Sequence, residues 1–300
     1  MFGRILLPLD GSELAEAALP YGEELAGRLG ADVVLLHVHG QDRSQGYEHV
    51  HQIYLDRLVD GMRQRIARYE PMGTKVKVEA KMEAGEPGET VCRFVEASDI
   101  DLVVMTAVGT AGLKVGKTLG SVADYICRTV PVPVLLVRPQ YAREVSPPVR
   151  LIRHLLAPTD GSDLSSLALP VSEELARELH ARITVFQMAQ MLRPIDDGYG
   201  GAVAINYIEL DERTRTLVDR EMAALEEQLR DKGLDVTRVV TSGYDAAAEI
   251  IDVAKRVGAD LIVMSTHGRS GPGRWVFGNV TEKVVRHGET PVMVVRANAG

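Results

Sequence analysis

The chain has 300 residues, of which 45% are hydrophobic and 25% are charged, a composition typical of a globular protein of about two domains. Its formal net charge of -8 argues against a surface for nucleic acids, because such surfaces are usually basic. Two cysteines are too few for a disulfide framework, and no apolar run reaches the roughly 18–20 residues of a membrane-spanning helix. We therefore expect a cytoplasmic protein that binds neither nucleic acid nor membrane.

The sequence contains an internal repeat of one unit. Residues 8–29 align with residues 158–179 at an offset of 150, and 13 of these 22 positions are identical. The similarity continues through the later apolar runs of both halves, as internal repeats do. We expect two domains, at residues 1–140 and 150–300. The segment between them contains Pro147 and Pro148, which disfavour both helix and strand.

Each unit alternates short apolar runs with stretches of helical periodicity. In chain order, the first unit predicts a strand at 4–9, a helix at 13–29, a strand at 32–38, a helix at 48–70, a strand at 75–82, a helix at 86–98, a strand at 101–106, a helix at 118–129 and a strand at 133–137. Pro20 and its counterpart Pro170 predict a kink in the first helix of each unit. Strands this rich in Val, Ile and Leu are typical of parallel sheets covered on both faces. The predicted fold class is α/β, with two tandem open parallel five-stranded sheets flanked by helices.

The residues after the first strand of each unit are candidates for a ligand site, since open parallel sheets bind ligands beyond the carboxyl ends of their strands. Asp10 and Asp160 occupy this place, and each begins an Asp-Gly-Ser sequence. Ser12 and Ser162 are suited to cap the following helix. The two aspartates either belong only to the turn, or accept hydrogen bonds from ribose hydroxyls or help to hold a metal ion.

A long glycine-rich loop follows the fourth strand of each unit, at 106–121 and 265–279. Glycines let the backbone approach a phosphate closely, and the N-terminus of the next helix attracts anions. The first loop contains Val-Gly-Lys-Thr, which looks like the end of a Walker A motif. That motif needs a glycine where the chain has Ala111, and the second loop has no Gly-Lys-Ser/Thr. We interpret the similarity to a P-loop as coincidence.

These features together resemble the universal stress protein family, in a tandem form of its ATP-binding branch. The resemblance rests on the first strand ending in Pro-x-Asp-Gly-Ser, the Leu-Leu-His-Val second strand, the Asp-Leu-x-Val-Met fourth strand and the Pro-Val-x-x-Val last strand. The nucleotide-binding branch carries G-x2-G-x9-G-[ST] after strand four. The second unit keeps this spacing but has Ser265 and Asn279 at the first and last positions. The first unit has Thr106 at the first position and one extra residue before Gly120.

The resemblance implies a Rossmann-like sheet of order 3-2-1-4-5 in each unit and a bound adenine nucleotide, ATP with Mg²⁺. Asp10 and Asp160 would contact the ribose or the metal–phosphate region, the backbone of Val38 and Met188 would meet adenine, and the glycine-rich loops would hold the phosphates. The implied site of the first unit comprises Pro8, Asp10, Val38, Met105, Thr106, Gly109, Thr110, Gly120, Ser121 and Val122, with Lys114 and Lys117 as basic candidates. That of the second unit comprises Pro158, Thr159, Asp160, Met188, Met264, Ser265, Gly268, Arg269, Ser270, Gly278, Asn279 and Val280.

Two functions are compatible with these patterns. The resemblance implies an ATP-binding regulatory protein of the stress response. The departures at Thr106, Ser265 and Asn279 leave open a nucleotide-independent scaffold of the same fold. No catalytic set of residues can be placed, so we expect at most slow ATP hydrolysis. By resemblance, the last strands, 133–137 and 292–296, which lie at the edges of their sheets, pair antiparallel, and two chains then form a homodimer.

Two further features have two interpretations each, and a third has one. His37 and His39 share one strand face and could ligate a metal, or they are ordinary histidines at a strand end. Residues 190–207 contain Gly-Tyr-Gly-Gly and either close over a ligand or form a disordered insertion. Trp275 lies in the second glycine-rich loop, where we expect it to anchor the following helix.

Overall fold

The computed structural model describes residues 2–40, 46–69, 75–109, 118–138, 150–191, 202–266 and 278–296, with the backbone alone for residues 46–48 and 202–208. The first unit contains β1 (Arg4–Leu9), α1 (Glu13–Glu16), α2 (Leu19–Leu29), β2 (Asp32–His39), α3 (Gly46–Ile66), β3 (Val78–Ala84), α4 (Pro87–Ala97), β4 (Leu102–Thr106), α6 (Ser121–Thr129) and β5 (Val134–Val137). The second unit contains β6 (His154–Pro158), α7 (Asp163–Ser166), α8 (Ala168–Leu179), β7 (Arg182–Gln190), α9 (Ala202–Asp231), β8 (Val236–Gly243), α10 (Ala246–Val257), β9 (Leu261–Ser265), α11 (Asn279–His287) and β10 (Val292–Val295).

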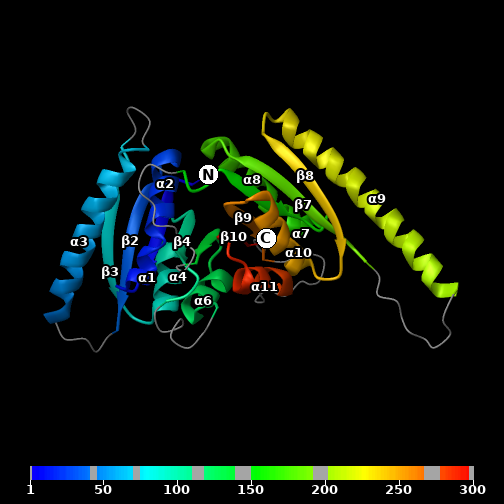
Figure 1. Cartoon of the computed structure of the whole chain (residues 1–300). Helices are drawn as coiled ribbons and strands as arrows, with labels where there is room; N and C mark the ends of the chain where they lie inside the picture. Colours follow the sequence, from blue (N-terminus) through cyan, green and yellow to red (C-terminus); the bar gives the residue numbers. More distant parts are fainter. Residues whose placement is uncertain are drawn as a thin grey trace.

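The strands form one ten-stranded sheet in the order β3-β2-β1-β4-β5-β10-β9-β6-β7-β8 (Figure 1). Each unit has the predicted order 3-2-1-4-5, and its strands are parallel. The two units join where β5 and β10 pair antiparallel, with Leu135 opposite Met293. The two predicted sheets are therefore one continuous sheet. The last strands lie at its centre, and β3 and β8 are its edges.

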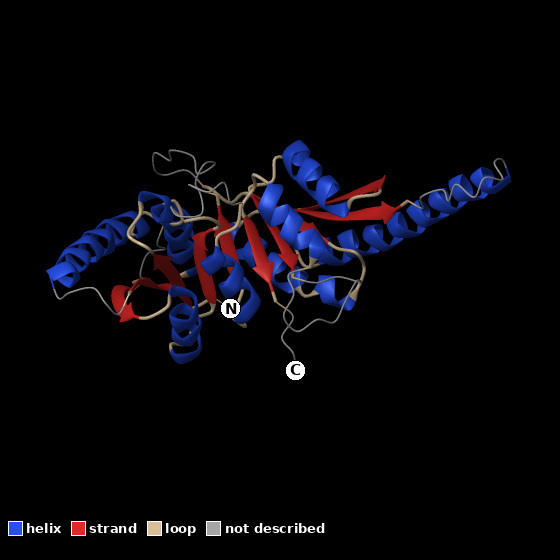
Figure 2. Ribbon diagram, turned by 90° about the horizontal axis from the view of Figure 1, so that it is seen from below, coloured by secondary structure: helices blue, strands red, loops and turns tan. Residues whose placement is uncertain are grey.

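Helices cover both faces of the sheet, and each face has its own apolar core (Figure 2). Alternate residues of a strand point to opposite faces. Ile5 and Leu7 of β1 therefore pack with α2 and α3, whereas Leu6 packs on the face of α4 and α6. Both cores contain residues of both units. Because the sheet is covered on both faces, its strands are continuous apolar runs. No helix in the described ranges is long and apolar enough to cross a membrane.

The first helix of each unit is broken where the sequence predicted a kink. α1 ends at Glu16, and α2 begins at Leu19 with Pro20 in its first turn. In the second unit, Pro170 likewise lies in the first turn of α8. Proline lacks an N–H group and clashes with the carbonyl four residues earlier, but it is tolerated where a helix begins, so the chain starts a new helix at this point. The third strand also differs from its prediction, because it runs from Val78 to Ala84 rather than over 75–82.

Two arginines hold the units together across the β5–β10 pair. Arg138, which follows β5, donates to the carbonyl of Val285 in α11, and Arg296, which follows β10, donates to the carbonyl of Thr129 in α6. On the other face, the buried carboxylate of Glu24 accepts the N–H of Leu151 at 2.6 Å. Desolvation by burial raises the pKa of Glu24, although this hydrogen bond opposes the shift. The units are therefore joined by backbone pairing and by side chains on both faces.

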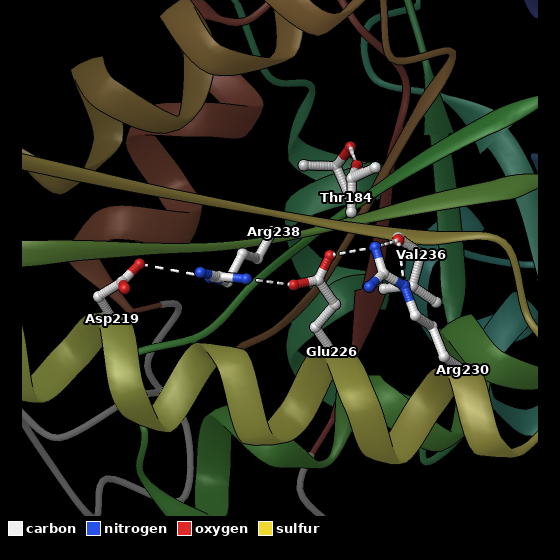
Figure 3. Close-up of polar contacts among 7 residues, drawn as sticks. Thr184, Asp219, Glu226, Arg230, Val236 and Arg238 are labelled. Carbon is white, nitrogen blue, oxygen red and sulfur yellow. Dashed lines mark hydrogen bonds and ion pairs between the residues drawn. The ribbon is translucent and has the colours of Figure 1, made fainter.

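An ion-pair network attaches α9 to the edge strand β8 (Figure 3). Glu226 is only 6% exposed and lies between Arg230, at 2.6 Å, and Arg238, at 2.5 Å. Arg230 also donates to the carbonyl of Val236, and in the first unit Arg63 of α3 donates to the carbonyl of Val78 at 2.7 Å. Each edge strand thus has one carbonyl satisfied by an arginine of the preceding helix, which reduces the tendency of an open edge to pair with another chain.

The close contact between α2 and α3 predicts opposite effects of the same substitution at two helical glycines. A Cβ at Gly27 would lie 2.5 Å from Cβ of Tyr69 and 3.1 Å from the carbonyl oxygen of Ile66. We expect Gly27→Ala to lower the free energy of unfolding by about 1–3 kcal/mol through overpacking. Gly61→Ala meets only the flexible end of Arg65 and should raise that free energy by about 0.5–1 kcal/mol, since alanine favours helix. Urea denaturation of both variants measures the difference, and equal effects would contradict this account of the packing.

Candidate functional site

Two cavities lie at the carboxyl ends of the strands, one in each unit, with volumes of ≈ 360 Å³ and ≈ 390 Å³. The walls of the first contain the following residues that the sequence singled out: Pro8, Asp10, Val38, Met105, Thr106, Gly109, Gly120, Ser121 and Val122. Those of the second contain Pro158, Thr159, Asp160, Met188, Met264, Ser265, Gly278, Asn279 and Val280. Outside the described residues lie Thr110, Lys114, Lys117, Gly268, Arg269, Ser270 and Trp275. The structure thus brings the described candidates of each unit together around one cavity.

The wall of each cavity nearest the helix after the third strand is apolar. In the first unit, Leu36 of β2, Met105 of β4 and Val91 of α4 form this wall. Phe186, Met264 and Ile250 occupy the matching places in the second unit. Sequence reasoning missed Leu36, Val91 and their counterparts, because nothing in an apolar periodic run distinguishes a residue facing a cavity from one inside the core. Such a wall suits a flat apolar ring.

Another part of each cavity wall is the beginning of a helix without a side-chain cap. α6 starts after Gly120 and α11 after Gly278, and neither glycine offers a side-chain acceptor to the first turn. Ser12, Ser162 and Asp245, in contrast, cap α1, α7 and α10 with their side chains. The first-turn N–H groups of a helix have no partner within the helix, and the helix dipole adds positive potential there. Both cavities therefore contain a place suited to an anion.

The Asp-Gly-Ser turns add a carboxylate to each cavity wall. Ser12 donates its N–H at 3.0 Å and its hydroxyl at 2.5 Å to one oxygen of Asp10, and Ser162 donates in the same way to Asp160. The turn requires a left-handed backbone, which glycine supplies at Gly11 with φ of 81°. The second oxygen of Asp10 faces Gly109, whose Cβ position would be 3.1 Å away. The predicted turn and serine cap are confirmed, and the same aspartate also lines the cavity.

His37 has a partner that the sequence did not predict. Its ring stacks on that of His51 of α3 with centroids 4.4 Å apart, and its Nδ1–H donates to the carbonyl of Leu9 at 2.9 Å. His39 instead contacts the carbonyl of its neighbour Gly40. In the described ranges no three His, Cys, Asp or Glu side chains are grouped as a metal site would need. Burial is the main cause that lowers the pKa of His37, and the nearby His51 and His39 add to this.

The two cavities differ where His37 lies. At the aligned positions, Thr159, Ser165 and Gln187 of the second unit replace Leu9, Ala15 and His37. Gln187 lines the second cavity together with Thr214 and Val218 of α9. The cavity of the second unit therefore extends as far as its long helix, α9. In the first unit, the stacked histidines lie beside Gly11 in this region.

The segment expected to be a lid or an insertion, residues 190–207, is partly regular structure. β7 ends at Gln190, and the backbone of residues 202–207 belongs to α9. Residues 192–201 lie outside the described part of the chain. α9 then extends beyond the end of the sheet before it packs against β7 and β8 (Figures 1 and 2).

Comparison with known proteins gives the same result for both units. The family model described as "Universal stress protein family" matches residues 1–138 and again residues 151–296. The universal stress protein YxiE of Bacillus subtilis is 28% identical over 149 residues, which is 49% of this chain and 100% of YxiE. The universal stress protein Rv1996 of Mycobacterium tuberculosis is 26% identical over 196 residues, 65% of this chain and 59% of that protein.

Solved structures share the fold over almost the whole chain. A universal stress protein from Archaeoglobus fulgidus superposes with a TM-score of 0.66 and 18% identity, covering 99% of this chain and 97% of the other. A putative universal stress protein from Pseudomonas aeruginosa has a TM-score of 0.65 and 19% identity, covering 98% and 93%. The tandem arrangement therefore occurs in other solved proteins.

The buried histidine predicts a loss of stability in mild acid. Because the pKa of His37 is lowered from 6.5, the unfolded chain takes up a proton at a pH where the folded chain does not. Stability should therefore fall as the pH drops from about 6.5 through the lower pKa of the folded state. The variant His37→Gln carries the residue that the second unit has at this position. Its melting temperature should fall less than that of the wild type between pH 7 and pH 5. The exposed His49→Gln serves as a control that should follow the wild type, and an unchanged pH profile for His37→Gln would contradict the argument.

Proposed function

The chain belongs to the universal stress protein family, and from this premise we propose that it is an ATP-binding regulatory protein of the stress response. One observation supports the ATP site most directly. Each unit places an uncapped helix N-terminus, a carboxylate and an apolar wall around one cavity at the carboxyl ends of parallel strands. These are the three environments that phosphate, ribose and adenine require.

The arrangement suggests how the nucleotide would lie. The phosphates would accept hydrogen bonds from the first-turn N–H groups of α6 or α11, where Gly120 and Gly278 leave the backbone accessible. Adenine would pack on the apolar wall near Val38 or Met188. Asp10 or Asp160 would accept hydrogen bonds from ribose hydroxyls or help to hold Mg²⁺. The cation would neutralise part of the phosphate charge, and a carboxylate is a donor that suits it.

Regulation rather than catalysis fits the residues around the cavities. A regulatory protein needs only that occupancy favours one conformation or one partner. No general base or nucleophile can be assigned among the described cavity residues, so we propose slow ATP hydrolysis at most. The antiparallel β5–β10 pair lies within one chain, and we propose that two such chains form a homodimer. A strictly monomeric mass in light scattering would reject the dimer.

A scaffold that does not bind nucleotide is the second candidate. Thr106, Ser265 and Asn279 replace residues of the family's nucleotide motif, and each lines its cavity. The glycine-to-hydroxyl changes narrow the space for phosphates, whereas Asn279 keeps its backbone N–H. Nucleotide content separates the two candidates.

The first test is to denature freshly purified protein and identify the released nucleotide by chromatography and mass. We expect one or two moles of ATP per chain. Gly109→Val should remove one mole if the first unit is loaded, because the new side chain starts 3.1 Å from the carboxylate of Asp10. Gly61→Ala, on the surface of α3, is a matched control that should keep the full amount. Protein that is empty and also gives no heat with Mg-ATP in calorimetry would leave only the scaffold.

A further inference from the structure

Gln187 is a mostly buried polar side chain that makes no side-chain hydrogen bond to the described residues. It is 3% exposed, and the described part of the chain offers its amide no hydrogen bond. Its neighbours on the same face of β7 are Val185 and Ala189, which pack in the core with Val218 of α9. Gln187 is nevertheless not a buried unsatisfied group, because a side chain on a cavity wall can bond to whatever fills the cavity. Gln187 lines the cavity of the second unit, so a ligand there can supply the missing bonds.

The surroundings of Gln187 select the chemistry of that ligand. Near it the cavity wall carries the hydroxyls of Thr159, Ser165 and Thr214 and the carboxylate of Asp160. Among the described residues of this wall there is no lysine or arginine. Amide and carboxylate oxygens accept hydrogen bonds from hydroxyl groups, whereas a carboxylate repels phosphate oxygens of the same charge. The phosphates belong at the other end, at the start of α11.

The first unit cannot make the same contacts. Leu9 and Ala15 stand where the second unit has Thr159 and Ser165, and neither can form a side-chain hydrogen bond. His37, the counterpart of Gln187, already donates to the carbonyl of Leu9 and stacks on His51. His37 does not line the described cavity of its unit. The two sites therefore differ in the hydrogen-bonding groups that they can offer to the sugar of a nucleotide.

We propose that Gln187 is a specificity-determining residue that hydrogen-bonds a ribose hydroxyl of the nucleotide in the second unit. The second unit then discriminates ribonucleotides from deoxynucleotides, and the first unit does so less. This inference rests on the proposed function, because it assigns a role within the same nucleotide site. A site that buries a polar group for a substrate hydroxyl rejects an analogue without it, since the group then remains unpaired.

The test uses full-length Gly109→Val protein, in which the new side chain should block the first cavity, and calorimetric titration with Mg-ATP, 2′-deoxyATP and 3′-deoxyATP. We expect one of the deoxy compounds to bind about tenfold more weakly than ATP, the loss typical of one hydrogen bond. Adding Gln187→Leu should weaken the binding of ATP by the same factor and leave the binding of that deoxy compound unchanged. The ratio of the two dissociation constants then falls to about one.

A second measurement separates this role from a purely structural one. Because the amide bonds to no described protein group, Gln187→Leu should leave the melting temperature of the nucleotide-free protein within about 2 °C of the wild type. Ser172→Ala is the matched control, since Ser172 is equally buried but donates to the carbonyl of Ala168 at 2.8 Å. It should lower the melting temperature and leave the ratio for ATP over the deoxy compound as it was.

The outcomes are distinguishable. If ATP binds but Gln187→Leu leaves the ratio unchanged, or lowers the melting temperature of the nucleotide-free protein by more than about 2 °C, the assignment of Gln187 is wrong and the proposed function stands. If the wild type binds no ATP at all, the proposed function fails and the assignment fails with it. Loss of the ratio in Gln187→Leu but not in Ser172→Ala supports the assignment.

Discussion

The antiparallel pairing of β5 with β10 is the interaction on which the rest of the molecule depends. Each unit ends in a short strand that is apolar on both faces, which in an isolated unit would be an open edge prone to aggregation. Pairing these strands turns two open edges into the centre of a ten-stranded sheet. It also lets both apolar cores run across the two units. The outer edges, β3 and β8, are protected differently, by charged residues and by arginines that satisfy carbonyl groups.

The position of each cavity at the carboxyl ends of the strands follows from the direction of the strands alone. The first, second and fourth strands of a unit are parallel, so the residues after them gather at one edge. This is why sequence position was enough to bring Asp10, Val38 and Gly120 to one cavity. It is also why the repeat was decisive, because a motif that is weak in one copy gains weight when its counterpart occupies the same place in the other.

Other features could not be found in this way. His51 and Thr214 reach their places through the packing of long helices, whose register against the sheet depends on the whole core and is not written in any short motif. The break before Pro20 was underestimated as a kink, because the proline could be accommodated by starting a second helix. The place of Gln187 on a cavity wall cannot be read from the sequence, where a glutamine in a strand looks like an ordinary surface residue. Its meaning appears only with its burial and its neighbours.

The direction of the strands has one more consequence. Because β5 and β10 run in opposite directions, the strands of the first unit point their carboxyl ends one way and the strands of the second unit point theirs the other way. The two cavities therefore open away from each other. A protein that covers one opening therefore leaves the other one accessible, and whatever binds in one cavity does not have to pass the other.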